Sequence, residues 1–339
     1  GDVGYYASIL IDVSGNPHIS YCDGTNYDLK YASWSVATGW LIQTLGTAGE
    51  YTSIAIDDSE NLYIAYYDKT NYDLKYASWS VTAGWSTQTV DSAGSVGKYT
   101  SIAIDGSKNP HIAYYDETNF ALKYASWSVT AGWSTQTVDS AGNVGQYTAI
   151  AIDGSGNPYI AYYDNTNTAL KYAKWTGSSW SIETVDSVDD TGQYTSIAID
   201  GSGNPHIAYY DNTNRDLRYA KWNGSSWSTQ TVDSIDNVGW FNSIAIDNSG
   251  NPQISYYDGT NLDLKYARWT NNPTLSWTGE TNYTTDGLDP ETGASTNTYI
   301  YRVKYTDTDN EVSASGYPKV HIKKGGTDIT GSPFTMSEV

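Results

Sequence analysis

One phrase occurs six times in this chain, and its spacing constrains the fold more than any other feature. The phrase is close to Tyr-Thr-Ser-Ile-Ala-Ile-Asp, a Ser-Gly-Asn-Pro turn, His-Ile-Ala-Tyr-Tyr-Asp and Leu-Lys-Tyr-Ala-x-Trp. The aspartate closing its first part recurs at intervals of 45, 48, 48, 47 and 47 residues, at Asp12, Asp57, Asp105, Asp153, Asp200 and Asp247. Such a period indicates supersecondary units that bury their faces only against neighbouring units.

Four short strands are predicted in each repeat. In the third copy they fall at residues 101–105, 111–116, 122–127 and 133–138. Gly, Asn, Asp and Pro stand between these segments, as hairpin turns require, while β-branched and aromatic residues fill them. No segment shows a convincing helical period, so the sequence predicts an all-β protein.

Side-chain alternation indicates that both faces of each sheet are covered. Ile102 and Ile104 share one face of the first strand, whereas Ser101, Ala103 and Asp105 share the other. Neither face carries the row of charges of a solvent-facing sheet, and large rings opposite Ala or Ser would interdigitate. Four-stranded antiparallel sheets stacked in this way predict a six-bladed β-propeller that closes on itself.

The sixth repeat lacks a clear fourth strand. The motif Trp-Ser-Thr-Gln-Thr-Val, present at 85–90, 133–138 and 227–232, has no copy after Trp269. The sixth blade therefore borrows residues 274–279, lacks its outer strand, or receives one from sequence outside this chain. A seven-bladed parent protein also stays open.

Two domains are expected. Residues 1–272 form the β-propeller, with six repeats of about 47 residues, and residues 273–339 lack the Ile-Ala-Ile-Asp motif of these repeats. Alternating Tyr and Val at 299–305 and turns rich in Gly, Asp and Pro predict a small immunoglobulin-like β-sandwich. In one interpretation this sandwich is incomplete at Val339. Because the chain opens inside a repeat frame, we expect it to be a piece of a longer protein.

The charge narrows the range of partners. The chain has 38 Asp and Glu against 18 Lys and Arg, a net charge of −20, which disfavours nucleic acid and anionic lipid as partners. No apolar run approaches membrane-spanning length, so no membrane insertion is expected. Cys22, the only cysteine, stands where other repeats have Tyr, and we interpret it as a packed residue and not a catalytic thiol.

The repeat resembles tandem units of predicted secreted or surface proteins of bacteria and archaea. Residues 200–211 and 217–220 carry this likeness, which covers roughly residues 5–270. Such units look like sialidase-type or lectin-type propeller blades. Residues 277–283 and 316–322 of the tail are similar to small immunoglobulin-like modules. The resemblance implies an extracellular or cell-surface location in a prokaryote, and adhesion more than a defined activity.

Catalytic constellations are hard to find. The sialidase Asp-box lies between the third and fourth strands, but here the Asp-x-Ser-Gly-Asn-Pro turn lies between the first and second. Of the four arginines, Arg215 and Arg218 share one hairpin and Arg302 lies in the tail, so a convergent arginine triad is hard to build. No Ser-His-Asp order, zinc spacing or phosphate loop stands out from the repeat. We therefore predict that the chain is not an enzyme.

Aromatic and acidic residues point to sugar recognition. The chain has 32 Tyr and 13 Trp, and sugar sites combine flat rings with carboxylate and amide acceptors. Six repeats would also supply several weak sites, which together bind a multivalent ligand with higher overall affinity. The alternative is that Asp and Asn cap hairpins while Trp fills the blade interface. The candidate ligand-binding residues are Asp116, Asn119 and Trp127 of the third repeat, and Asp211, Asn214 and Trp222 of the fifth.

Three histidines form a second candidate set. His18, His111 and His206 occupy one repeat position, with Tyr or Gln in the repeats between them. A ring of these side chains around the propeller axis would bind a metal or a sugar. The alternative is that each is a half-exposed strand residue.

Calcium is the one cofactor considered. In the tail Asp307, Asp309 and Glu311 place oxygens at alternate positions, and hard oxygen ligands suit Ca²⁺. The segment lacks the glycine and the terminal glutamate of an EF-hand loop, so an acidic solvated turn is the alternative.

The functional prediction is a non-enzymatic extracellular protein that mediates adhesion or binds glycans through repeated blade surfaces. The alternative is a structural subunit of a surface layer, sheath or filament, self-associating through its C-terminal module. A glycoside-processing enzyme is the residual alternative. The expected partners are glycans or other surface proteins.

Overall fold

The computed structural model describes residues 1–269 and, beyond them, eight short strands of the C-terminal region. The chain divides into two compact units, Gly1–Arg268 and Trp269–Val339. Among the described residues, no helix has the length and hydropathy needed to cross a bilayer.

The first unit consists of six antiparallel sheets, each made from one sequence repeat. Blade one has β1 (Val3–Ile11), β2 (Pro17–Asp23), β3 (Asp28–Ser35) and β4 (Gly39–Gly46). Blade two has β5 (Gly49–Ile56), β6 (Leu62–Asp68), β7 (Asp73–Ser80) and β8 (Gly84–Asp91). Blade three has β9 (Val96–Ile104), β10 (Pro110–Asp116), β11 (Ala121–Ser128) and β12 (Gly132–Asp139).

The remaining blades repeat this order. Blade four has β13 (Val144–Ile152), β14 (Pro158–Asp164), β15 (Ala169–Trp175) and β16 (Trp180–Asp186). Blade five has β17 (Thr191–Ile199), β18 (Pro205–Asp211), β19 (Asp216–Trp222) and β20 (Trp227–Asp233). Blade six has β21 (Val238–Ile246), β22 (Pro252–Asp258) and β23 (Asp263–Arg268), and the structure describes no fourth strand in its sheet.

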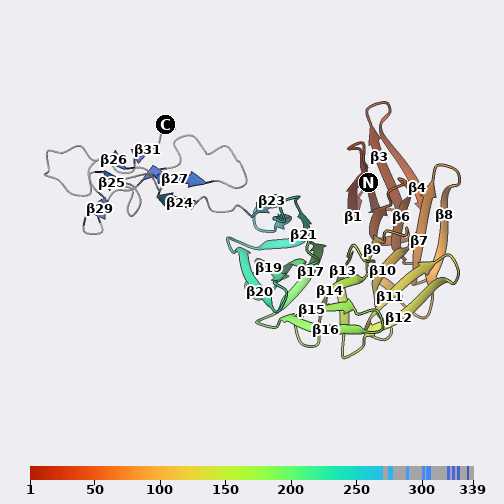
Figure 1. Ribbon diagram of the computed structural model, residues 1–339. Helices are drawn as coiled ribbons and strands as arrows, with labels where there is room; N and C mark the ends of the chain where they lie inside the picture. Colours follow the sequence, from red (N-terminus) through yellow and green to blue (C-terminus); the bar gives the residue numbers. More distant parts are fainter. Residues whose placement is uncertain are drawn as a thin grey trace. The chain divides into compact units, whose positions relative to one another are not determined.

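The six-bladed β-propeller with four-stranded antiparallel blades is confirmed. Within each blade the strands pair in chain order, and the first strands of successive blades lie side by side. Figure 1 shows the blades following one another, with first strands such as β9, β13 and β17 toward the middle and fourth strands such as β8, β12 and β16 outside. Each observed first strand begins about five residues before the predicted segment.

An aspartate at the end of each first strand fixes the turn to the second. Asp105 accepts hydrogen bonds from the backbone N–H groups of Ser107 and Asn109, both at 2.8 Å. The Asn109 side-chain amide donates to the other carboxylate oxygen at 3.0 Å. These bonds lower the pKa of Asp105 although burial raises it. The Asp-x-Ser-Gly-Asn-Pro turn therefore shapes a hairpin.

The core lies between blades. The cluster between blades three and four joins Leu122 and Ala113 of blade three to Ile150, Ile160 and Tyr162 of blade four. Tyr162 is fully buried next to the small Ala113. The expected interdigitation of large rings with alanines is present at this interface.

Each first strand carries a bulge that turns an aromatic ring toward the axis. In β13 the register shifts at Gln146, between a glycine and a tyrosine that both have positive φ: Gly145 at 101° and Tyr147 at 52°. A Cβ on Gly145 would lie 2.7 Å from the Cα of Leu122 in blade three, so only glycine fits there. Positive φ at a tyrosine is strained, and it recurs in every blade at Tyr6, Tyr51, Tyr99, Tyr147, Tyr194 and, as phenylalanine, Phe241.

The expectation that the ring closes on itself needs a correction. The broad face of blade six that points away from blade five is open, and its Leu264 is 83% exposed. On blade one, Ile9 is 62% exposed. Equivalent side chains at the interfaces between blades are almost completely buried. Blades one and six therefore do not pack on each other as the other pairs do.

The second unit is described only as short paired strands. β24 (Thr274–Trp277) pairs with β27 (Val303–Thr306), and β25 (Leu288–Asp289) pairs with β26 (Ile300–Tyr301). β28 (Lys319–Val320) pairs with β31 (Phe334–Thr335), and β29 (Lys323–Lys324) pairs with β30 (Thr327–Asp328). Because β24 pairs with β27, residues 274–277 do not complete blade six. The immunoglobulin-like module depends mostly on residues outside the described ones, and it stays a prediction.

Candidate functional site

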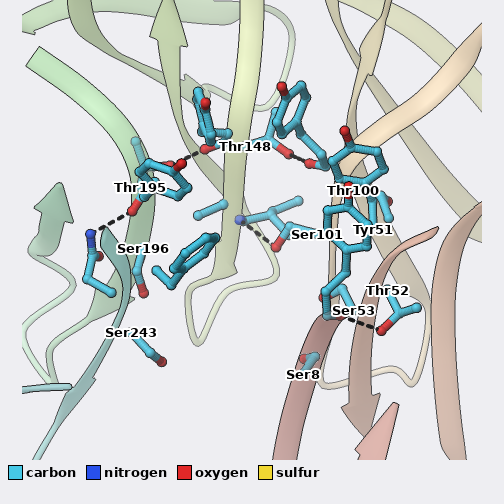
Figure 2. Close-up of a pocket in the computed structure, with 18 of the residues that line it drawn as sticks. Ser8, Tyr51, Thr52, Ser53, Thr100, Ser101, Thr148, Thr195, Ser196 and Ser243 are labelled. Atoms are coloured by element: carbon cyan, nitrogen blue, oxygen red, sulfur yellow. Dashed lines mark hydrogen bonds between the residues drawn. The ribbon is translucent and has the colours of Figure 1, made fainter. Parts of the chain in front are cut away.

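A central cavity of about 450 Å³ is lined by the first strands of all six blades. Three or four consecutive positions of each strand line it, most often beginning with Tyr, Thr and Ser (Figure 2). Neighbouring rings lie close together, with centroids 4.2 Å apart for Tyr6 and Tyr51 and 4.8 Å for Tyr194 and Phe241. None of the described residues that line this cavity is a carboxylate, a histidine, a lysine or an arginine.

Most of the serine and threonine hydroxyl groups of this cavity hold the blades together. Thr52 donates to the carbonyl oxygen of Tyr6 at 2.8 Å, and Thr195 donates to that of Tyr147. Ser196 accepts from the backbone N–H of Ile244 at 2.9 Å. Figure 2 shows such bonds running from blade to blade. Since these hydroxyls are already engaged, we do not choose the central cavity as the ligand site.

A second kind of pocket lies between blades, near the hairpins that join third and fourth strands. The four–five pocket, about 320 Å³, has Tyr172 and Glu183 of blade four on one side and Trp222 of blade five on the other. Tyr159, Lys174, Gly203, Asn204 and Pro205 also line it. Lys174 places its ammonium 4.9 Å from the centre of the Tyr159 ring.

The same repeat positions form a smaller pocket between blades two and three. This two–three pocket, about 170 Å³, is lined by Tyr76, Ser78 and Gln88 of blade two and by Trp127 and Trp133 of blade three. Gln88 stands where the four–five pocket has Glu183, and Ser78 where it has Lys174. One aromatic pocket design therefore recurs with different polar groups.

Tryptophan indoles at these two blade interfaces differ in their hydrogen bonding. Trp227, which packs edge-on against Tyr172 with centroids 5.0 Å apart, donates to Glu183 at 3.1 Å. Trp133 packs in the same way against Tyr76, yet its buried indole N–H has no partner among the described residues. A buried unpaired donor is costly, so this group would favour a ligand oxygen.

The predicted sugar-binding residues do not meet within one blade. Trp127 and Trp222 line the two pockets, as just described. Asp116 instead caps the hairpin at the opposite end of its blade, where Asn119 donates to it twice at 2.9 Å. Asp211 and Asn214 form the same cap in blade five.

The three histidines are not gathered around the axis. His206 is fully buried in blade five and contacts Tyr219 Oη at 2.6 Å and Asp200 Oδ2 at 3.3 Å. His111 and His18 contact the equivalent tyrosine and aspartate of their own blades, three and one. Over the described part of the chain, no group of three or more His, Cys, Asp or Glu side chains could hold a metal ion. The structure therefore offers no histidine ring.

The calcium candidates Asp307, Asp309 and Glu311 lie outside the described residues. Cys22 is buried, and burial raises its pKa to about 11, which agrees with a packed residue. Sequence reasoning missed the contributions of the preceding blade, such as Tyr172, Glu183 and Tyr76. The signal was in the repeat, but it required knowing which faces of neighbouring blades meet.

Comparison with known proteins gives a fold and no family. No family model matches the sequence, and no curated protein matches it either. A polysaccharide lyase described as an ulvan lyase has a similar structure, with a TM-score of 0.53 and 14% identity over 78% of this chain and 78% of that chain. A fucose-specific lectin from Aleuria aurantia gives 0.52 and 16% over 79% of this chain and 92% of that chain. A protein of unknown function from Dyadobacter fermentans gives 0.56 and 8% over 79% and 94%.

These similarities overturn the functional prediction of a non-enzymatic adhesion or glycan-binding protein. A polysaccharide lyase stands beside a lectin among similarly folded proteins, so the fold gives no ground for preferring a non-enzymatic role. The ulvan lyase has also been solved with -[GlcA(1-4)Rha3S]- bound. At these identities the likeness shows the fold alone.

Proposed function

We propose that this propeller binds saccharides in the pockets between its blades. The observation that carries the proposal is the recurrence of one aromatic pocket at two interfaces, with Trp222 in one and Trp127 in the other. Flat rings stack against the C–H faces of sugars, while amide, carboxylate and hydroxyl groups hydrogen-bond to their hydroxyls. The lectin and the lyase of similar fold support this class of ligand.

The pocket chemistry favours neutral saccharides. The chain carries a net charge of −20, which repels a polyanion at long range. The two–three pocket offers the neutral groups Ser78 and Gln88 and the unpaired indole N–H of Trp133. The four–five pocket has the carboxylate Glu183 beside the cation Lys174, and it should be the more selective of the two.

Two sites on one molecule would bind a polysaccharide more tightly than a short oligosaccharide. Cleavage of the bound chain would be a property additional to binding. An extracellular or surface location would suit such a ligand and stays a prediction.

The test is a binding assay with neutral oligosaccharides on the full chain and on three single variants. We expect Trp222→Ala and Trp127→Ala each to weaken binding at their own pocket about fivefold, since a lost stacking contact is worth about 1 kcal/mol. Trp34→Ala is the matched control: Trp34 holds the same repeat position in blade one, where no described blade supplies the opposite wall.

Unchanged affinity in both pocket variants, with folding verified by circular dichroism, would contradict the proposal. So would a preference for a sulfated uronate polymer over every neutral glycan. Release of reducing ends or unsaturated products from a bound polysaccharide would add catalysis to the function without moving the site.

A further inference from the structure

The gap between blade six and blade one exposes both halves of a blade interface. We call it the seam; its walls are Leu264 and Tyr266 on blade six and Ile9, Ile19 and Tyr21 on blade one. Leu264 is 83% exposed and Tyr266 61% exposed. The leucines at the same repeat position are all fully buried: Leu29, Leu74, Leu122, Leu170 and Leu217.

Blade one shows the complementary exposure. Ile9 is 62% exposed, whereas its equivalents are only 6% to 9% exposed: Ile54, Ile102, Ile150, Ile197 and Ile244. Patches of apolar surface this open usually meet a partner.

The interior interfaces show what such a partner looks like. Between blades four and five, Leu170 and Tyr172 pack in one cluster with Ile197, Ile207 and Tyr209. Leu264 and Tyr266 repeat the first half of this cluster, and Ile9, Ile19 and Tyr21 repeat the second half. The seam thus continues an interface that the molecule forms five times, and each wall fits the opposite face of the same repeat.

The polar groups of the interior interfaces also recur at the seam. At an interior interface Asp139, which ends the fourth strand of blade three, accepts from Tyr162 at 2.7 Å and pairs with Lys171. Blade one carries Tyr21 and Lys30 at the equivalent positions, and Lys30 pairs there with Asp28 of its own blade at 3.2 Å. On the other wall, Ser243 stands where Ser196 accepts the backbone N–H of Ile244. Figure 2 shows Ser243 and Ser8 on strands at the two sides of the opening.

We propose that the seam binds one further blade of this same repeat. Each of the six repeats in residues 1–269 already forms a blade of its own, so none of these six fills the gap. An intact second copy does not fit, because docking its blade one on blade six brings its blade two into the position of this chain's own blade one. A single repeat with both faces free matches the two walls at once.

Such a repeat would fold only as it docks, because one repeat alone cannot bury its two faces. Its Leu and Tyr face would cover Ile9, and its Ile and Tyr face would cover Leu264. The aspartate ending its fourth strand would reach Tyr21 and Lys30.

The probe is a synthetic peptide of residues 142–188, the fourth repeat, added to the full chain. We expect saturable binding of one peptide per chain and a rise in the melting temperature with peptide concentration, as for any ligand specific to the folded state. Leu264→Asp and Ile9→Asp should each weaken binding at least tenfold. Val129→Asp is the matched control, since Val129 is 91% exposed in a blade-three hairpin away from the seam.

Four results would overturn the proposal. The peptide fails to bind the folded chain, or it binds the two seam variants as tightly as the unaltered chain. Alternatively, the chain alone dimerises through a surface that Leu264→Asp disrupts, which would make the partner a second copy. Finally, cysteines placed at Ser8 and Ser243 cross-link readily, which would mean that the two walls close directly on each other. None of these outcomes bears on the pockets lined by Trp127 and Trp222, so the saccharide proposal stands or falls separately.

Discussion

Leu170 and Leu264 occupy the same position of the repeat, yet one is fully buried and the other is 83% exposed. Each follows a hairpin that an aspartate caps, and each lies in a third strand with the sequence Leu-Lys-Tyr-Ala. The difference is the neighbour: Leu170 has blade five against it, and Leu264 has no described blade. Burial in this fold is therefore a property of a pair of repeats, as expected for units stacked in one dimension.

The largest effect should come from truncating these two leucines. Leu170→Ala should lower the free energy of unfolding by about 2–5 kcal/mol, because it leaves a cavity in a closely packed interface. Leu264→Ala should change it by less than about 0.5 kcal/mol, because the removed atoms are already in water. Urea unfolding followed by tryptophan fluorescence measures both values.

Equal losses for the two variants would break the comparison. A large loss at Leu264 would mean that the outer face of blade six is covered in solution, and the seam would not be a free surface. Leu217→Ala, at the interface between blades five and six, serves as a second interior variant.

The blades could be predicted from the sequence because their signals are local. The hairpin aspartate Asp105, its partner Asn109 and the alternation of Ile102 with Ala103 all act within one repeat. Repetition then specified that neighbouring sheets cover each other. The bulge at Gly145 and Tyr147 was not predicted, because its need for glycine arises from Leu122 in another blade.

The pockets and the seam could not be predicted for the same reason. Trp222 lines a pocket, but Asp211 and Asn214 were grouped with it only because they are close in sequence. Its spatial neighbours Tyr172 and Glu183 come from the preceding repeat. Likewise, the exposure of Leu264 depends on the absence of a described neighbour, which a repeat pattern does not reveal.

A second, smaller effect concerns histidines that the interior blades bury. Burial lowers the pKa of His206 below its usual value, although the hydrogen bond to Asp200 opposes the shift. The folded state then binds fewer protons than the unfolded state just below pH 6.5, so stability is lost as the pH falls through this window. The contribution of one such histidine is at most about 1.4 kcal/mol per pH unit.

His206→Tyr should remove this part of the pH dependence without loss of stability at pH 7.5. Tyr159, at the same position of blade four, donates to Asp153 at 3.0 Å, so a tyrosine satisfies the turn aspartate there. Denaturation at several pH values between 7.5 and 5.5 measures the slope, and His111→Tyr is the parallel variant in blade three. An unaltered slope in the double variant would show that other groups cause any acid destabilisation in this range.

The smallest effect should be a gain in the free energy of unfolding from a substitution at the interface between blades one and two, next to the seam. Tyr114, Tyr162 and Tyr256 each donate to an aspartate that ends the fourth strand of the preceding blade, at 2.7 Å in all three cases. Between blades one and two that residue is Gly46, whose added Cβ would lie 3.9 Å from the Tyr66 hydroxyl and meet nothing closer. Burial raises the pKa of Tyr66 to about 12, so its hydroxyl keeps its proton and can donate.

Gly46→Asp should therefore raise the free energy of unfolding by about 1 kcal/mol, since a hydrogen bond to a charged group is offset in part by desolvation of the carboxylate. Gly46→Ala is the control for the loss of glycine flexibility in the unfolded chain, which alone contributes about 0.4–1 kcal/mol. The comparison is the difference between the two variants at pH 7, where Lys75 stands at the repeat position of Lys123, the lysine that pairs with Asp91. If aspartate stabilises the protein no more than alanine, the carboxylates at the interior interfaces satisfy buried tyrosines without adding net stability, and the first interface loses nothing by having a glycine.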